Sequence, residues 1–297
     1  MWIKASGALT ENVVQISTSV STHLLILGEL AAVVDTGISA VHARLIEELE
    51  RSMGEGGSLD YILLTHAHFD HVGGIPYLRK KYPDAVLVTG RQTAEILSQP
   101  EMLEQFYVKN LACAEAMNSE LELSKEDWIE ALRVDRIYGD GDTLPLGDDV
   151  EVKLIAVPGH TEDAVAYFVR PDSALACGES VGAYAGRDKI YSCFCASYAD
   201  YVESLDKLAG LDVRILSLPH GGVVTGELVP KFFSQARQEA ERFQQSVKER
   251  IDQGELTTEI FESLLPEWQL QSICPEGPFV EEQRMVLQAM IKAVAGA

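Results

Sequence analysis

Polar side chains directly follow a short apolar run, and this junction constrains the fold and the chemistry of the chain more than any other feature. The run Tyr61–Leu64 predicts a buried strand that ends where the polar side chains begin. The four polar side chains are His66, His68, Asp70 and His71. Residues i and i+2 of an extended strand point to the same side, so we expect the first two of these side chains to bind one ion and the last two to turn toward a second. The alternative is a loop of solvated polar residues.

Two of the other histidines occupy the same kind of position. His160 follows a Pro-Gly pair after an alternating apolar run, and His220 follows a proline at the end of another apolar run. Functional residues are often carried on turns at the ends of strands, and imidazole is a common ligand of Zn²⁺ and Fe. We therefore predict that both bind metal, although a histidine at a strand end can also be an ordinary hydrogen-bonded residue. His23 is expected to open a strand and His42 to lie on an amphipathic helix, neither with a catalytic role.

These motifs together resemble the metallo-β-lactamase superfamily. The similarity is carried by the His-x-His-x-Asp-His pattern at 66–71, by Pro-Gly-His-Thr around His160, by Cys-Gly-Glu-Ser around Glu179 and by Pro-His-Gly-Gly around His220. Asp35 in Val-Val-Asp-Thr-Gly also fits the family pattern. The motifs follow one another in the family's order, so the resemblance covers most of the chain.

The resemblance implies a centre of two divalent metal ions, Zn or Fe, with Mn also open. Glu179 stands where the family usually has a bridging aspartate. Its extra methylene group leaves three arrangements open: it bridges both ions, it favours one ion, or it leaves one site weak. Otherwise it is a carboxylate that faces water. The implied ligands are His66, His68 and His160 for the first ion, Asp70, His71 and His220 for the second, and Glu179 between them.

The same resemblance suggests how the site works. Divalent ions lower the pKa of bound water to about 7, and the water is expected to lie near Asp70 and Glu179, the two residues predicted to be catalytic. A thioester suits such a site because a thiolate, with a pKa of about 8.5, leaves without a strong general acid. No general acid is assigned, and Tyr184 and Tyr191 are candidates only by their expected position on a loop. Asp35 is expected to orient a metal-binding histidine, or to cap the helix that follows, or both.

Composition excludes several classes of partner. The chain has 24 Lys and Arg against 46 Asp and Glu, a net charge of −22, which argues against nucleic acid and anionic membranes. No apolar run approaches the roughly 18 residues that span a bilayer, and the N-terminus lacks a signal-peptide pattern. Five cysteines form no paired framework, so we expect a reduced, cytoplasmic location. Cys193 and Cys195 are interpreted as packing residues of an apolar loop rather than as ligands.

The distribution of apolar residues and the resemblance together predict an α+β fold, an αββα sandwich of two sheets with helices outside. We expect a metallo-β-lactamase-like domain at 1–226, with a helical insert at about 91–132, and a helical C-terminal extension at 227–297. The insert and the extension would roof the metal site and shape an apolar pocket. This layout is similar to the branch that contains the quinolone-signal-response (2-aminobenzoylacetyl-CoA) thioesterase.

The sequence therefore predicts a metal-dependent hydrolase that acts on a thioester or another small ester-type molecule. Two alternatives stay open: a mononuclear iron oxidoreductase of the persulfide dioxygenase type, and a non-enzymatic regulatory or binding protein that retains its metal. The expected partner is a small-molecule substrate, and assembly as a homodimer is also open.

Overall fold

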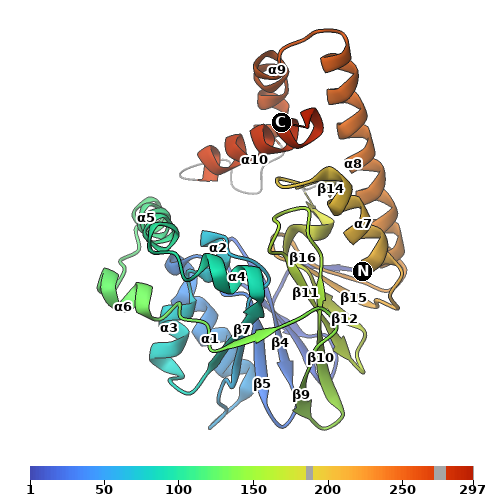
Figure 1. Cartoon of the computed structure of the whole chain (residues 1–297). Helices are drawn as coiled ribbons and strands as arrows, with labels where there is room; N and C mark the ends of the chain where they lie inside the picture. Colours follow the sequence, from blue (N-terminus) through green and yellow to red (C-terminus); the bar gives the residue numbers. More distant parts are fainter. Residues whose placement is uncertain (185–189, 271–278, 297) are drawn as a thin grey trace.

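Two sheets packed face to face form the centre of the structure (Figure 1). The computed structural model describes residues 1–184, 190–270 and 279–296. The first sheet contains, in spatial order, β2 (Gly7–Ala8), β3 (Val13–Ser17), β4 (Thr22–Leu27), β5 (Ala31–Val34), β6 (Tyr61–Leu63), β7 (Val86–Gly90) and β8 (Arg136–Tyr138). The second contains β1 (Trp2–Ile3), β16 (Gly222–Thr225), β15 (Ile215–Leu218), β12 (Ala174–Ala176), β11 (Val165–Arg170), β10 (Val150–Ala156) and β9 (Thr143–Gly147).

Helices cover the outer faces of both sheets, which makes the structure an αββα sandwich and confirms the predicted fold class. Two short strands, β13 (Ala183–Tyr184) and β14 (Ile190–Tyr191), pair with each other, and two 3₁₀ turns are η1 (Ser39–Val41) and η2 (Gly178–Val181). The helices that connect strands of the first sheet along the chain are α1 (His42–Met53), α2 (Phe69–Val72), α3 (Ile75–Lys81), α4 (Arg91–Ile96), α5 (Pro100–Ala116) and α6 (Lys125–Glu130). The second sheet is covered by α7 (Tyr198–Ala209) and α8 (Leu228–Asp252), and the chain then forms α9 (Thr257–Leu270) and α10 (Phe279–Ala295).

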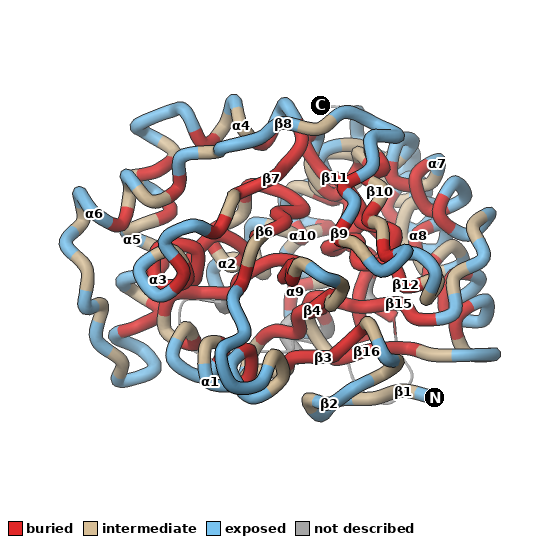
Figure 2. The backbone as a smooth tube through the Cα atoms, turned by 90° about the horizontal axis from the view of Figure 1, so that it is seen from below, coloured by how far each residue is buried: buried red, intermediate tan, exposed pale blue. Residues whose placement is uncertain are grey.

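Apolar side chains fill three layers that follow from this arrangement. The layer between the sheets contains Leu63 from β6 and Val152 and Leu154 from β10, on the alternating pattern that a half-buried strand requires. A second layer packs the first sheet against α1, α3 and α5, and a third packs the other sheet against α7 and α8. Figure 2 shows buried strands at the centre and exposed segments around them.

Parallel pairing brings the ends of five strands to one edge of the sandwich. In the first sheet β5, β6 and β7 run parallel to one another. In the second sheet β12 is parallel to β15, and β10 runs in the same direction because two antiparallel pairings separate it from β12. The residues that follow β5, β6, β10, β12 and β15 therefore meet at this edge, which is where ligands bind in many α/β folds.

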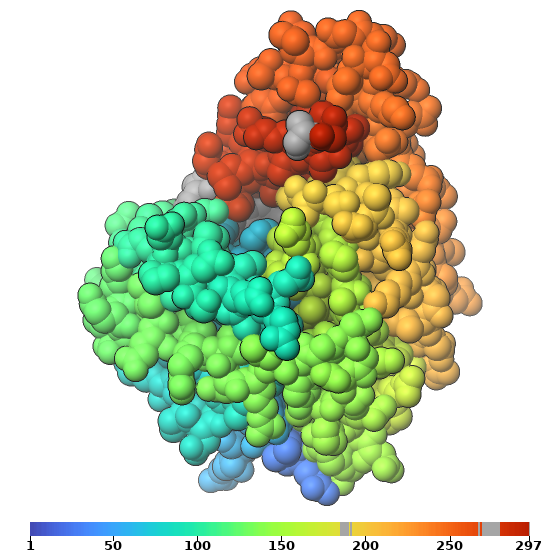
Figure 3. Space-filling model, in the orientation of Figure 1, coloured from blue at the N-terminus to red at the C-terminus, as the bar shows by residue number. Residues whose placement is uncertain are grey.

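The helical C-terminal extension has its own apolar core. Buried residues of α8, α9 and α10 pack there with Phe194 and Tyr201. Helix α10 also reaches the helical insert, where Lys109 Nζ of α5 lies 2.7 Å from Glu282 Oε2. Figures 1 and 3 show α9 and α10 at the same end of the sandwich as α2 and α5. The boundary between the two units, placed at 226 and 227 from the sequence, remains a prediction.

The structure differs locally from the sequence-based expectations. The insert at about 91–132 was expected to be wholly helical, but the chain leaves the helical conformation at 97–99 and at 117–124. The short strands β1 and β16 were not expected, because β16 begins with a glycine and β1 has only two residues. In the described part of the chain, no helix is long and apolar enough to cross a membrane.

A glycine beside the histidine cluster gives a test of this packing. A Cβ atom on Gly73 would collide with Asn110 Oδ1 and lie 2.5 Å from the backbone nitrogen of Ser39. We expect Gly73→Ala to lower the free energy of unfolding by about 2 kcal/mol, because Asn110 Oδ1 accepts the Ser39 N–H and cannot move freely. Gly7→Ala is the control, since nothing lies within 4 Å of its added carbon. Equal urea midpoints for the two variants would contradict this account.

Candidate metal centre

Three histidines converge to form a first group of ligand atoms. His66 and His68 follow β6, and His160 lies in the turn between β10 and β11. His68 Nδ1 is 2.9 Å from His66 Nε2 and 3.2 Å from His160 Nε2, so the three rings present nitrogen atoms to one small volume. The three ligand atoms all lie within 4.8 Å of one another. Such a set of imidazoles fits Zn²⁺ or Fe.

Three further residues, Asp70, His71 and His220, form a second group together with Glu179. His220 Nε2 lies 3.3 Å from Asp70 Oδ2 and 3.1 Å from Glu179 Oε1, and His71 Nε2 lies 3.2 Å from the same Glu179 oxygen. Asp70 and His71 are on α2, and His220 follows β15. All four ligand atoms fall within 4.8 Å of one another.

Glu179 lies between the two groups, with one oxygen toward each. Its Oε1 contacts the second group, while Oε2 lies 3.5 Å from His66 Nε2 and 3.6 Å from His160 Nε2. This Oε2 is buried and has no hydrogen-bond partner. Gly178, with φ of +50°, allows the close approach, because a Cβ there would be 3.1 Å from Thr65 Oγ1. An orphaned buried carboxylate oxygen among imidazole nitrogens fits a pair of divalent cations.

The carboxylates and histidines of the site stabilise one another's charges. Burial opposes ionisation of Glu179, but the charge of His71 and hydrogen bonds with His220 and His71 outweigh it and hold the pKa of Glu179 well below its usual range. Burial likewise opposes protonation of His220, yet hydrogen bonds with Asp70 and Glu179 raise its pKa to about 10. The pKa of His66 falls, because burial and the neighbouring His71 and His68 disfavour its charged form. The two carboxylates thus stay ionised, and positive charge between them stabilises the site.

Backbone and carboxylate partners hold the outward-facing nitrogens of three histidines. Asp35 Oδ2 lies 2.9 Å from His71 Nδ1, and the Asp35 carboxylate also accepts the N–H and hydroxyl of Thr65. The Nδ1–H of His160 donates to the Cys193 carbonyl, and that of His220 donates to the carbonyl of Val20. These bonds leave Nε2 free to face an ion, as metal-bound histidines require. The alternative that Asp35 caps the next helix is not seen, because η1 has Ile38 at its N-cap and no side-chain cap bond.

The arrangement matches a known family. The profile of the metallo-beta-lactamase superfamily matches residues 18–220, which include all seven predicted ligands. This chain belongs to the metallo-beta-lactamase superfamily.

Individual members of the superfamily are similar to the chain at low identity. A hydroxyacylglutathione hydrolase of Acidiphilium cryptum is 30% identical over 181 residues, or 59% of this chain and 54% of that protein. An atrochrysone carboxyl ACP thioesterase of Claviceps purpurea is 24% identical over 253 residues, or 81% of this chain and 66% of that protein. The chain thus spans less than two thirds of the length of both curated relatives. The solved structure of a metallo-beta-lactamase superfamily protein from Sulfolobus tokodaii aligns with a TM-score of 0.58 at 21% identity, covering 94% of each chain.

One residue of this superfamily chain supports the histidine loop and was missed from the sequence. Asp163 Oδ2 accepts the backbone N–H of Ala67 at 2.8 Å and the hydroxyl of Thr93 at 2.9 Å. Asp163 therefore fixes the backbone between His66 and His68. The available signal was its position, three residues after His160 in Gly-His-Thr-Glu-Asp.

The cysteine pair lies closer to the site than the packing interpretation implied. Cys193 is buried, as packing requires, but the thiol of Cys195 forms a hydrogen bond with His160. A hydrogen bond with Cys193, reinforced by one with His160, holds the pKa of Cys195 well below its usual range. Cys274 lies outside the described residues.

Neither tyrosine considered as a general acid gains support. Tyr184 packs against Trp2 and Phe232 in an aromatic cluster, and the side chain of Tyr191 is outside the described part of the structure.

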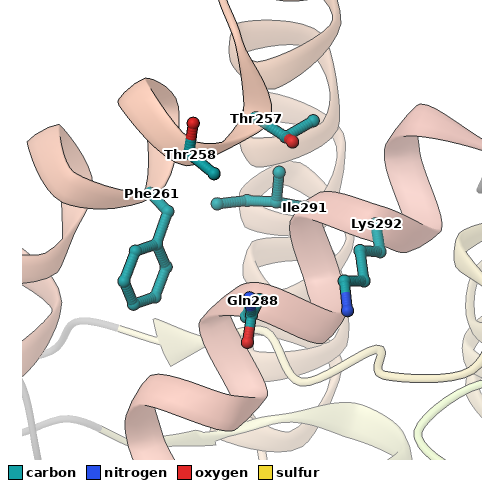
Figure 4. A pocket seen from close by; sticks show the side chains of 6 residues that line it. All are labelled: Thr257, Thr258, Phe261, Gln288, Ile291 and Lys292. Carbon is teal, nitrogen blue, oxygen red and sulfur yellow. The ribbon is translucent and has the colours of Figure 1, made fainter.

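A small pocket of about 50 Å³ between α9 and α10 contains none of the site residues (Figure 4). Its lining residues are Thr257, Thr258, Phe261, Gln288, Ile291 and Lys292.

The two remaining histidines have structural contacts. His42 stacks on Tyr77, with ring centroids 3.7 Å apart. His23 is buried; its Nδ1–H donates to the Asp35 carbonyl, and its Nε2 accepts from the Ser21 hydroxyl. Both ring nitrogens are therefore satisfied in the neutral form, and burial lowers the pKa of His23 to about 4.

This lowered pKa predicts a pH dependence of stability. Between pH 6.5 and 4 the unfolded chain binds a proton at position 23 that the folded protein does not, so acid favours unfolding. From pH 7 to pH 4, in buffers with a chelator, we expect the wild-type protein to lose about 3 kcal/mol more unfolding free energy than His23→Asn, which cannot titrate. Urea unfolding at both pH values measures the difference. Parallel losses in the two proteins would show that His23 does not drive it.

The contact between Asp35 and His71 predicts a loss of metal affinity. We expect Asp35→Asn to bind Zn²⁺ about 10 to 100 times more weakly, because the neutral amide no longer holds the His71 ring as a carboxylate does. Competition with a chromophoric chelator measures this. Asp60→Asn is the control, since Asp60 accepts the Ala31 N–H away from the site. Unchanged affinity in Asp35→Asn would remove Asp35 from the orienting role.

Proposed function

We propose that this protein is a metal-dependent hydrolase with a centre of two divalent ions, acting on a thioester or another small ester. The observation that carries the proposal is Glu179, which turns one oxygen toward each of the two ligand groups. The assignment follows the two groups. His66, His68 and His160 hold the first ion, Asp70, His71 and His220 hold the second, and Glu179 bridges.

Bound divalent ions lower the pKa of water and polarise a carbonyl oxygen. The side chains of the chain supply the rest. Asp70 and Glu179 stay ionised, because the neighbouring histidines lower the pKa of each, so they accept hydrogen bonds from the attacking water and orient it. Asp35 and Asp163 hold the histidine loop rigid, which keeps the ligand geometry constant during the reaction.

Two considerations favour a thioester. A thiolate leaves at neutral pH without a strong acid, and Tyr184, the candidate acid whose side chain is described, packs against Trp2 and Phe232. Similar proteins carry the names hydroxyacylglutathione hydrolase and atrochrysone carboxyl ACP thioesterase, although at 30% and 24% identity. We propose that α5 and α10, joined by Lys109 and Glu282, form a wall that selects the acyl group. A cytoplasmic location and a homodimer remain predictions from the sequence.

The alternatives are less well supported. A mononuclear iron oxidoreductase needs one ion, whereas the second group also offers four converging ligands. A non-enzymatic binding protein needs no ionised carboxylate that water can reach, yet Asp70 beside His220 is only partly buried.

The proposal predicts two ions per chain and turnover that depends on the site. We expect elemental analysis to find two equivalents of Zn or Fe, and His68→Ala to lower kcat/KM for an acyl thioester at least about 100-fold, because it removes a ligand of the first group. Glu179→Gln should reduce bound metal, and Glu179→Asp, which keeps the charge, should retain more. His42→Ala is the control, a histidine stacked on Tyr77 away from the centre.

Two results would overturn this function. Full metal content without turnover on thioesters, lactones and phosphodiesters would favour the binding role. One iron per chain with oxygen consumption on a persulfide would favour the oxygenase.

A further inference from the structure

The segment that carries Cys193 and Cys195 is fastened to the turn that carries His160. The Cys195 N–H donates to the His160 carbonyl at 3.1 Å, and the His160 Nδ1–H donates to the Cys193 carbonyl at 2.8 Å. The Ala196 N–H donates to the carbonyl of Gly159 at 3.1 Å. These bonds fix the backbone of the cysteine segment beside the His160 ring.

We infer that Cys193, Cys195 and His160 form a further metal site, which takes a thiophilic divalent ion such as Zn²⁺. One ligand atom from each residue lies within 4.8 Å of the others. Zn²⁺ bonds of about 2.3 Å to sulfur and about 2.0 Å to nitrogen separate ligand atoms by about 3.5 to 4 Å, so small side-chain rotations complete the site. The Cys195 sulfur therefore lies close to both the Cys193 sulfur and the His160 ring.

Thiolate ligands give this site a different selectivity from the two groups around Glu179. Sulfur selects soft ions, whereas carboxylates and imidazoles accept harder ones. Binding of one divalent ion forms two metal–sulfur bonds and one metal–nitrogen bond, releases the thiol protons to solvent and takes a water as fourth ligand. Cys193 and His160 are buried while Cys195 is half-buried, so the ion enters on the Cys195 side.

His160 belongs to both this site and the first ligand group, so the two compete. An ion held by the thiols draws the His160 imidazole away from His66 and His68. The first ligand group then loses one of its three ligands. Occupancy of the thiol site is therefore inhibitory. This consequence rests on the proposed hydrolase function, whereas the binding site does not.

Titration of the purified protein, with its resident metal, by Cd²⁺ tests the inference. We expect one equivalent of Cd²⁺ to produce the ultraviolet charge-transfer absorbance of a cadmium thiolate, and thioester turnover to fall at least about 10-fold as that absorbance saturates. Cys193→Ser and Cys195→Ser should each abolish the absorbance and retain turnover in Cd²⁺. Cys113→Ser is the matched control, since this buried thiol lies elsewhere on α5, and it should behave as wild type.

Several outcomes would overturn the inference. No thiolate absorbance in the wild-type protein, or absorbance that survives in Cys195→Ser, removes the site. If the thiolate absorbance develops while thioester turnover stays unchanged, His160 is not shared between the two sites. If Cys193→Ser does not fold, the half-buried Cys195→Ser carries the test alone. A cysteine-dependent absorbance in a protein that hydrolyses no thioester supports the thiol metal site and contradicts the hydrolase proposal. Failure of the metal site and failure of the hydrolase function can therefore be told apart.

Discussion

A buried carboxylate that needs positive charge on two sides organises the centre of this protein. Glu179 is only 8% exposed, and an isolated charge at such a position costs several kcal/mol. Histidines from both halves of the sandwich surround it: His66 and His71 from the edge of the first sheet, and His160 and His220 from the second. Each oxygen of Glu179 thus contacts one histidine from each sheet, so the carboxylate ties the two sheets together at this edge.

Strand ends could be predicted from the sequence because periodicity and turn residues are local signals. The apolar run before His66 and the Pro-Gly before His160 each mark such an end, and parallel pairing then brings the ends to one edge. The substitution of Glu179 for an aspartate was also visible, but its orientation was not, because it depends on the backbone of Gly178.

Contacts between distant segments could not be predicted. Asp163 accepts a backbone N–H from Ala67, 96 residues away in the chain, and no local pattern encodes that bond. The approach of Cys195 to His160 likewise depends on how the segment before α7 folds back on the turn. The helices of the extension were expected from their apolar spacing, whereas their position over the insert follows from tertiary contacts such as Lys109 with Glu282.

The tight turn at Gly159 links the metal centre to the C-terminal extension. This residue has φ of +134° and lies so close to the backbone of Tyr201 that a side chain would overlap it. The ring of Tyr201 is fully buried in the apolar core formed with α8, α9 and α10. If an ion held by His160 stabilises this turn, it also stabilises the packing of Tyr201 in the extension, and by thermodynamic reciprocity a well-packed extension then raises the affinity for the ion. The C-terminal helices would in that case contribute to metal affinity without supplying a ligand.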